Sequence, residues 1–223
     1  IAKDDTMPGI VLAFVAAAFD VTAAALGWDH VRAFSKPLPA VILAVSALLS
    51  GRNRILGIGL LLAAVGDEAL LHASSDAFLS GMLAFAAMHV CYILAYRSTG
   101  SSAPRDRLTW LYAALCLVAV AGANLLLDPH AGSFALPLAV YSLLLAAMAW
   151  SAFDVHNRVR PGAIAIAIGG AAFMLSDTTL AFAKFYPGFA LGGRGAELAI
   201  LGTYFVAQLL ITSGMLRANA TAS

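Results

Sequence analysis

Residues 55–73 read ILGIGLLLAAVGDEALLHA. These nineteen residues have the length that an α-helix needs to cross the hydrocarbon core of a bilayer, which is about 20 residues. Asp67 and Glu68 are unusual in such a stretch, because an ionisable side chain inside a membrane span costs on the order of 2.5–3.5 kcal/mol on insertion scales. The stretch therefore predicts a transmembrane helix whose buried carboxyl group needs a partner, an aqueous cavity or a function.

The same pattern recurs along the whole chain. Apolar residues make up 61% of the sequence and charged residues 11%, whereas soluble domains are roughly half apolar and a quarter charged. We therefore predict an all-α fold, a polytopic transmembrane helical bundle that forms a single membrane domain over residues 1–223. About eight spans are expected, at residues 8–26, 35–51, 55–73, 77–96, 108–127, 133–153, 161–183 and 195–216.

Charge distribution predicts the orientation of this bundle and excludes one class of partner. With eight spans, both termini share a side with nine of the thirteen basic residues, which are Lys3, Arg52, Arg54, Arg97, Arg105, Arg107, Arg158, Arg160 and Arg217. Since positive charge is retained on the cytoplasmic side, both termini are expected to be cytoplasmic. The net charge of +1, without a basic cluster, gives no support to nucleic-acid binding.

Polar residues inside the spans are predicted to gather at one depth. With a rise of about 1.5 Å per residue, Asp67 lies about 18 Å and Asp177 about 24 Å from the cytoplasmic start of its span. Tyr204 and His89 lie roughly 14–18 Å below the outer boundary by the same estimate, and Lys36 opens the second span. We expect these side chains to line one cavity that opens to the outer interface.

Helical spacing supports that expectation, because residues three, four or seven apart share a face. The spacing predicts two polar stripes: Phe85, His89, Tyr92 and Tyr96 in one, and Glu197, Leu201, Tyr204 and Gln208 in the other. Asp20 and Glu197 also lie within or beside spans, and no role is assigned to either.

Structural explanations remain open for several of these residues. Lys36 can be a basic residue that reaches the membrane interface from a span end, and Lys184 and Arg194 are read as ordinary loop charges. His89 and Tyr92 can be interior residues that hydrogen-bond between helices. A metal site would need Glu68 and His72, spaced i,i+4, yet the usual zinc motifs are absent from the sequence, so no metal is expected.

Five short motifs occur in a telling order along the chain. They are Lys36-Pro37-Leu38-Pro39 at the start of a span, Gly66-Asp67 followed by Leu70, Phe85-x3-His89-x2-Tyr92, Ser176-Asp177 followed by Leu180-Ala181, and Tyr204-x3-Gln208. This order resembles the lysoplasmalogenase-like membrane family, called YhhN in bacteria, from the second span onward. Two departures are present: Glu68 follows the aspartate where the family often has an apolar residue, and the motif of the sixth span is reduced to Tyr141 with Met148 and Trp150.

The resemblance implies an enzyme that cleaves the vinyl ether bond of a lysoplasmalogen. The products would be a fatty aldehyde and glycerophosphoethanolamine or glycerophosphocholine, no cofactor is implied, and the partners would be a lysophospholipid substrate and membrane lipid. It also implies an integral, multi-pass protein of the bacterial inner (plasma) membrane.

Vinyl ether hydrolysis suits a pair of carboxyl groups, one to protonate the alkene and one to activate water. We expect Asp67 and Asp177 to take these two roles, in either order, with His89 as the third catalytic residue, which orients or relays protons. The candidate substrate-binding residues are Lys36 for the lipid phosphate, Tyr204 and Gln208 for the glycerol hydroxyl or water, Tyr92 and Glu68.

Two other classes of protein are alternatives to an enzyme, and they differ in whether they explain the buried charges. A small proton-coupled or cation-binding transporter would bind its ion with the same carboxylates, and such proteins often have interrupted spans; Gly169-Gly170 is one candidate interruption. A non-catalytic lipid-binding or scaffold protein would leave the free-energy cost of the buried charges unexplained.

Overall fold

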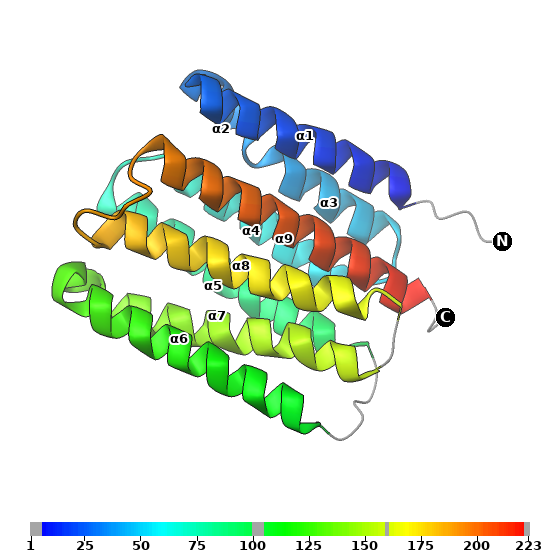
Figure 1. The fold of residues 1–223 in the computed structure, drawn as a ribbon. Coiled ribbons are helices and arrows are strands. Elements are labelled where there is room, and N and C mark those ends of the chain that lie inside the picture. Colours follow the sequence, from blue (N-terminus) through cyan, green and yellow to red (C-terminus); the bar gives the residue numbers. More distant parts are fainter. Residues whose placement is uncertain (1–5, 100–104, 159–160, 221–223) are drawn as a thin grey trace.

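The chain folds entirely into helices over the residues that the computed structural model describes, which are 6–99, 105–158 and 161–220. Nine α-helices and two short 3₁₀ turns follow one another in this part of the chain (Figure 1). The α-helices are α1 (Met7–Leu26), α2 (Asp29–Ser35), α3 (Leu38–Leu49), α4 (Arg54–Ala69), α5 (Ser75–Arg97), α6 (Arg107–Ala131), α7 (Ala135–Asp154), α8 (Ala163–Phe185) and α9 (Arg194–Ala220). The prediction of an all-α fold is therefore confirmed.

The long helices run roughly side by side, so that the molecule has two distinct ends. At one end, on the left in Figure 1, lie the turns between α1 and α2, α4 and α5, α6 and α7, and α8 and α9. We call this the cavity end, for the cavity described below. The start of α1 and the end of α9 lie at the opposite end, which we call the terminal end.

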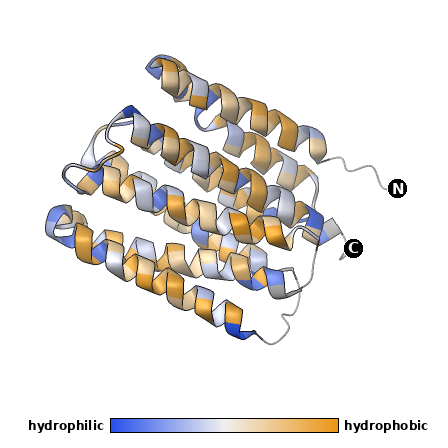
Figure 2. Ribbon diagram, in the orientation of Figure 1, coloured by the Kyte–Doolittle hydropathy of each residue, from blue (hydrophilic) through white to orange (hydrophobic). Residues whose placement is uncertain are grey.

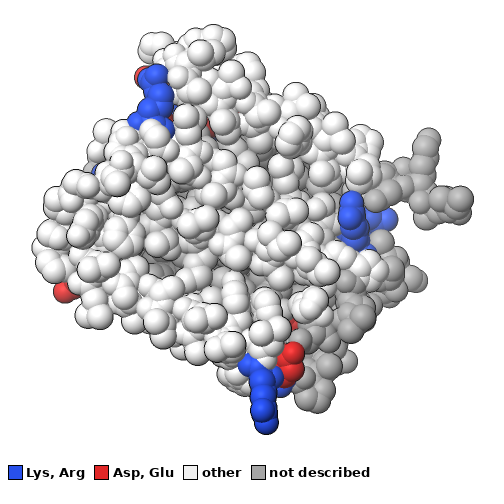
Figure 3. All heavy atoms as spheres, in the orientation of Figure 1, with Lys and Arg blue, Asp and Glu red and all other residues white. Residues whose placement is uncertain are grey.

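The helices expose many large apolar side chains between these two ends. Apolar residues dominate the middle of the helices (Figure 2), and on the face shown in Figure 3 lysine, arginine and acidic side chains appear near the two ends only. Phe14, Leu49, Val118, Leu125 and Leu136 are each at least 60% exposed, which in a membrane protein means contact with lipid. The protein is a multi-pass integral membrane protein.

Six stretches in the described part of the chain are long and apolar enough to span a membrane. One of them, Arg107–Asp154, contains both α6 and α7, and α4, with 16 residues, is shorter than a usual span. The count of eight spans and the cytoplasmic location of both termini stay predictions.

Local sequence explains why a polar residue lies at the cavity end of α4. Asn53 begins the helix, since its side chain accepts a hydrogen bond from the Leu56 backbone N–H, as expected of an N-terminal cap. The helix ends at Ala69, and Ser74 caps the start of α5 in the same way. Asp67 therefore lies in the last turn of α4, at the mouth of the bundle.

The most extensive helix contact joins α8 and α9, and glycines make it possible. A Cβ at Gly169 would lie 3.0 Å from the Ala207 carbonyl oxygen of α9, and a Cβ at Gly214 would lie 2.7 Å from the Gly162 carbonyl oxygen. Such close approach is typical of small residues between membrane helices. Helix α8 runs unbroken through Gly169 and Gly170, so the interpretation of these glycines as an interruption is wrong.

Candidate functional site

A cavity of about 720 Å³ opens among α2, α4, α5, α8 and α9 at the cavity end. Its polar lining consists of Arg32, Lys36, Asp67, His72, Ser176, Asp177, Lys184, Tyr186, Glu197 and Tyr204. Leucine, isoleucine, phenylalanine, alanine and glycine residues complete the wall. A cavity with charged groups at one end of an apolar bundle is suited to an amphiphile.

Asp67 is nearly inaccessible, with 2% of its surface exposed. Its Oδ2 atom accepts a hydrogen bond of 2.6 Å from the Tyr204 hydroxyl. The Tyr204 hydroxyl in turn accepts a hydrogen bond of 3.2 Å from Nε2 of Gln208, whose Oε1 atom accepts from the Tyr92 hydroxyl. The line of donors running from α5 through α9 to α4 fixes the position of the Asp67 carboxyl group.

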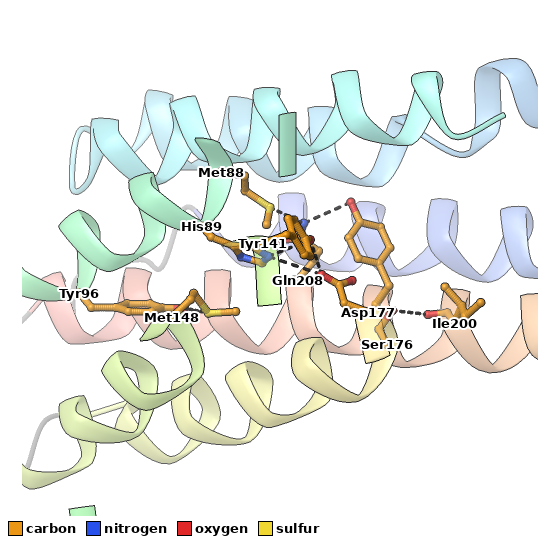
Figure 4. Close-up of polar contacts among 10 residues, drawn as sticks. Met88, His89, Tyr96, Tyr141, Met148, Ser176, Asp177, Ile200 and Gln208 are labelled. Carbon is orange, nitrogen blue, oxygen red and sulfur yellow. Dashed lines mark hydrogen bonds and ion pairs between the residues drawn. The ribbon is translucent and has the colours of Figure 1, made fainter. Parts of the chain in front are cut away.

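Asp177 is held by a second group of polar residues from α5 and α7 (Figure 4). Its Oδ2 atom accepts a hydrogen bond of 2.5 Å from the Tyr141 hydroxyl and lies 3.5 Å from Nε2 of His89. The same His89 nitrogen lies 3.1 Å from the Tyr141 hydroxyl. Three helices thus bring a carboxyl group, a phenol and an imidazole to one point.

Aromatic rings fill the space between the two polar groups. The Phe173 ring lies 5.0 Å from the His89 ring and 5.5 Å from the Tyr204 ring, centroid to centroid, both edge to face. Phe85 meets Tyr204 in the same way at 5.9 Å. These contacts stiffen the wall behind the carboxyl groups, because edge-to-face pairs favour one relative orientation.

Two buried cationic side chains lie near the mouth of the cavity. Arg32 is 5% exposed; its Nε atom lies 3.6 Å from the Asp20 carboxylate and its Nη1 atom donates to Glu197. Lys36 is 8% exposed, and its side chain makes no direct hydrogen bond or ion pair with any other residue that the structure describes. Its ammonium group is therefore available to an anionic ligand.

A second hollow of about 450 Å³ adjoins this mouth. It shares Arg32, Lys36, His72 and Glu197 with the cavity and adds Asp29, His30 and Glu68. Both signs of charge are present there. The arrangement can accommodate a zwitterionic group outside the cavity, while an apolar group enters it.

The predicted site residues fall into three sets. Lys36, Asp67, Asp177 and Tyr204 line the cavity. His89, Tyr92 and Gln208 do not line it and lie behind Asp177 and Tyr204. Glu68 lies on the rim, where its carboxylate is 3.8 Å from Nε2 of His72.

The residues without an assigned role are also placed. Asp20 is fully buried and accepts a hydrogen bond of 2.6 Å from the Ser35 hydroxyl, which ties α1 to α2. Lys184 lines the cavity with its amine 5.1 Å from the Phe78 ring centroid. Arg194 donates to the Ala25 carbonyl oxygen at 3.2 Å, close to the end of α1.

Comparison with known proteins identifies the family. The model of the YhhN family matches residues 31–215, which is most of the chain. The chain belongs to the YhhN family. This membership confirms the resemblance inferred from the five motifs.

Characterised relatives of this YhhN protein are enzymes by name. Human lysoplasmalogenase TMEM86B is 34% identical over 189 residues, which cover 83% of this chain and 75% of the relative. Pig lysoplasmalogenase TMEM86B is 36% identical over 157 residues, which cover 69% of this chain and 59% of the relative. Bovine lysoplasmalogenase TMEM86A is 28% identical over 159 residues, which cover 69% of this chain and 62% of the relative. No solved structure matches the YhhN chain.

Sequence reasoning missed two residues of this YhhN site. Arg32 lies in the short helix α2, which the predicted spans treated as a loop, and it reaches the cavity only because the chain turns back between α1 and α3. Tyr141 was noted only as the remnant of a motif, yet it contacts both Asp177 and His89. Its position in the middle of an apolar span was the available signal.

Proposed function

We propose that this protein is a lysoplasmalogenase, a hydrolase of the vinyl ether bond of lysoplasmalogens. One observation carries the proposal: Asp67 and Asp177, from two different helices, line a single cavity that is charged at its mouth and apolar within. The names of the relatives, lysoplasmalogenase in each case, support the substrate class.

The reaction needs one acid and one base. A carboxylic acid transfers its proton to the alkene carbon farther from the ether oxygen, which leaves an oxocarbenium ion stabilised by the second carboxylate. That carboxylate then takes a proton from the water that attacks the cationic carbon. The resulting hemiacetal breaks down to the free alcohol of the glycerophospho group and a fatty aldehyde. Asp67 and Asp177 are the two carboxyl groups in this scheme.

The surrounding residues orient these carboxyl groups. Tyr204 and Gln208, with Tyr92 behind them, hold Asp67 by the line of hydrogen bonds. Tyr141 and His89 hold Asp177. Tyr204 also faces the cavity, where its hydroxyl can contact the glycerol hydroxyl or the attacking water.

The headgroup of the substrate is assigned to the mouth. Lys36 offers a buried ammonium group for the phosphate, since it makes no direct ion pair within the described chain. Glu68 lies on the adjoining rim and offers a carboxylate to the cationic amine of ethanolamine or choline. This placement leaves the alkenyl chain inside the bundle.

The membrane arrangement completes the proposal. We assign eight spans to one membrane domain of residues 1–223, with both termini in the cytoplasm of a bacterial cell and the cavity facing outward across the plasma membrane. Support comes from the shared end of α1 and α9 and from the excess of basic residues there. The substrate would enter from the outer leaflet.

The proposal is tested with purified protein in detergent, a lysoplasmalogen substrate and a measurement of free aldehyde. Asp67→Asn and Asp177→Asn are each expected to abolish aldehyde release, while Tyr141→Phe lowers kcat by about tenfold to a hundredfold, the value of a hydrogen bond to a charged group. Gel filtration and thermal unfolding check that the variants are folded. Near-normal turnover by either asparagine variant, or no aldehyde from the parent protein, contradicts the proposal.

A further inference from the structure

A second, narrow pocket of about 50 Å³ lies between α5, α6, α7 and α8. Its wall is mostly apolar and includes Met82, Val120, Ala123, Leu127, Leu138 and Leu145; its polar members are Asn124, Tyr141, Ser142, Asp177 and Thr178. We call this pocket the slot. From Val120 to Leu127 it follows about 10 Å of helix α6, at 1.5 Å per residue.

The slot adjoins the cavity. Leu70, Phe78, Phe85, Asp177 and Leu180 line both spaces. Among the residues that the structure describes, Asp177 is the only acidic one that lines both spaces, whereas Asp67 lines the cavity alone. The junction of an apolar space and a polar one therefore coincides with one member of the carboxyl pair.

We propose that the slot binds the hydrocarbon chain of the substrate and thereby sets both the chain length and the orientation in which the vinyl ether meets Asp177. This inference rests on the proposed function. The wall of the slot matches an alkyl chain in polarity, and its narrowness excludes a bulkier group. Each methylene buried in such a space strengthens binding roughly fourfold.

The orientation assigns the acid and the base. The alkene carbon that accepts the proton is the one attached to the chain, so it lies on the slot side, next to Asp177. Asp177 gives its proton to this carbon as the π bond breaks, and the electron pair on the ether oxygen forms the oxocarbenium ion. Asp67, on the polar side, lines the cavity together with Lys36 and takes a proton from water as the carbon–oxygen bond forms.

A matched pair of substitutions tests the slot. Ala123→Phe fills it, whereas Ala119→Phe makes the same change one turn earlier on α6, at an exposed position outside the slot. The substrates are lysoplasmalogens with octenyl and octadecenyl chains. For Ala123→Phe the ratio of kcat/KM for the long chain to that for the short chain is expected to fall by at least about tenfold, the discrimination typical of a steric change in an apolar pocket. For Ala119→Phe the ratio stays at the parent value.

The outcomes separate the slot from the proposed function. If the parent protein cleaves neither lipid, the proposed function fails; if it cleaves both and Ala123→Phe keeps the parent ratio, the slot fails. If Ala123→Phe does not fold, Ala123→Leu is used instead, and the ratio of kcat/KM for the long chain to that for the short chain is again expected to fall.

A binding measurement that needs no turnover completes the test. A saturated alkyl ether lysolipid with a diazirine at the end of its chain is bound to the parent protein, irradiated and located by mass spectrometry. Adducts on residues of α6 and α7 that line the slot support the proposal. Adducts confined to the cavity mouth or to lipid-facing residues overturn it.

Discussion

At the scale of single residues, the site depends on two carboxyl groups that are held alike and placed differently. Each accepts a hydrogen bond from a tyrosine hydroxyl, Asp67 from Tyr204 and Asp177 from Tyr141. Only Asp177 borders the slot. Because their hydrogen bonding is so similar, position relative to the substrate is what distinguishes the acid from the base.

Azide distinguishes the two roles, since it attacks an oxocarbenium ion without a general base. In Asp67→Asn, which lacks the base, Asp177 still protonates the alkene, and azide is expected to form an azido ether adduct of the lipid that mass spectrometry detects. Asp177→Asn lacks the acid and is expected to form none. Adduct formation by Asp177→Asn alone would reverse the assignment.

At the scale of helices, the position of the site depends on how closely α8 and α9 pack. These helices carry Asp177 and Tyr204, one partner of each polar group. Their contact needs glycine where a Cβ would meet backbone, as at Gly169, 3.0 Å from the Ala207 carbonyl oxygen. The same helices contain glycines without this constraint, such as Gly202, where no atom lies within 4 Å of an added Cβ.

Gly169→Ala is therefore expected to lower the free energy of unfolding by about 1–3 kcal/mol, the usual penalty of overpacking. Gly202→Ala is the matched control and is expected to be neutral, or to stabilise its helix by about 0.5–1 kcal/mol. Thermal unfolding of both variants in detergent compares them. Equal melting temperatures would mean that α8 and α9 can move apart to accommodate the added Cβ without a loss of stability.

At the scale of the whole molecule, charge and apolar surface determine how the protein lies in the membrane. The long helices expose leucine, valine and phenylalanine along their length, and charge is confined to the ends on the face in view (Figure 3). The cavity opens at the end opposite to the start of α1. Its side of the membrane therefore follows from the location of the termini.

Cysteine labelling in intact bacterial cells tests this orientation. In a background without Cys91 and Cys116, Arg107→Cys places a thiol at the terminal end and His130→Cys places one at the cavity end; both positions are exposed. A membrane-impermeant maleimide is expected to label His130→Cys and to leave Arg107→Cys unlabelled until the membrane is permeabilised. The opposite pattern would place the cavity in the cytoplasm.

The amino-acid sequence alone predicts the helical class, the approximate helix positions, the family and most of the candidate residues. These features are local or ordered along the chain: apolar stretches fix the helices, the cost of buried charge marks Asp67, His89 and Asp177, and the motif order marks the family. Helical spacing also placed His89 and Tyr92 on one face of α5, and both are buried there.

Which of these residues come into contact depends on how the helices pack against one another. The contact of Tyr141 with Asp177, the entry of Arg32 into the cavity and the withdrawal of Tyr92 and Gln208 behind Tyr204 each depend on side chains from different helices. Spacing along one helix fixes a face and a depth, but not the rotation of that helix against its neighbours. That rotation is set by packing, such as the glycine contact between α8 and α9, and it is what turns separate polar residues into one cavity with a slot beside it.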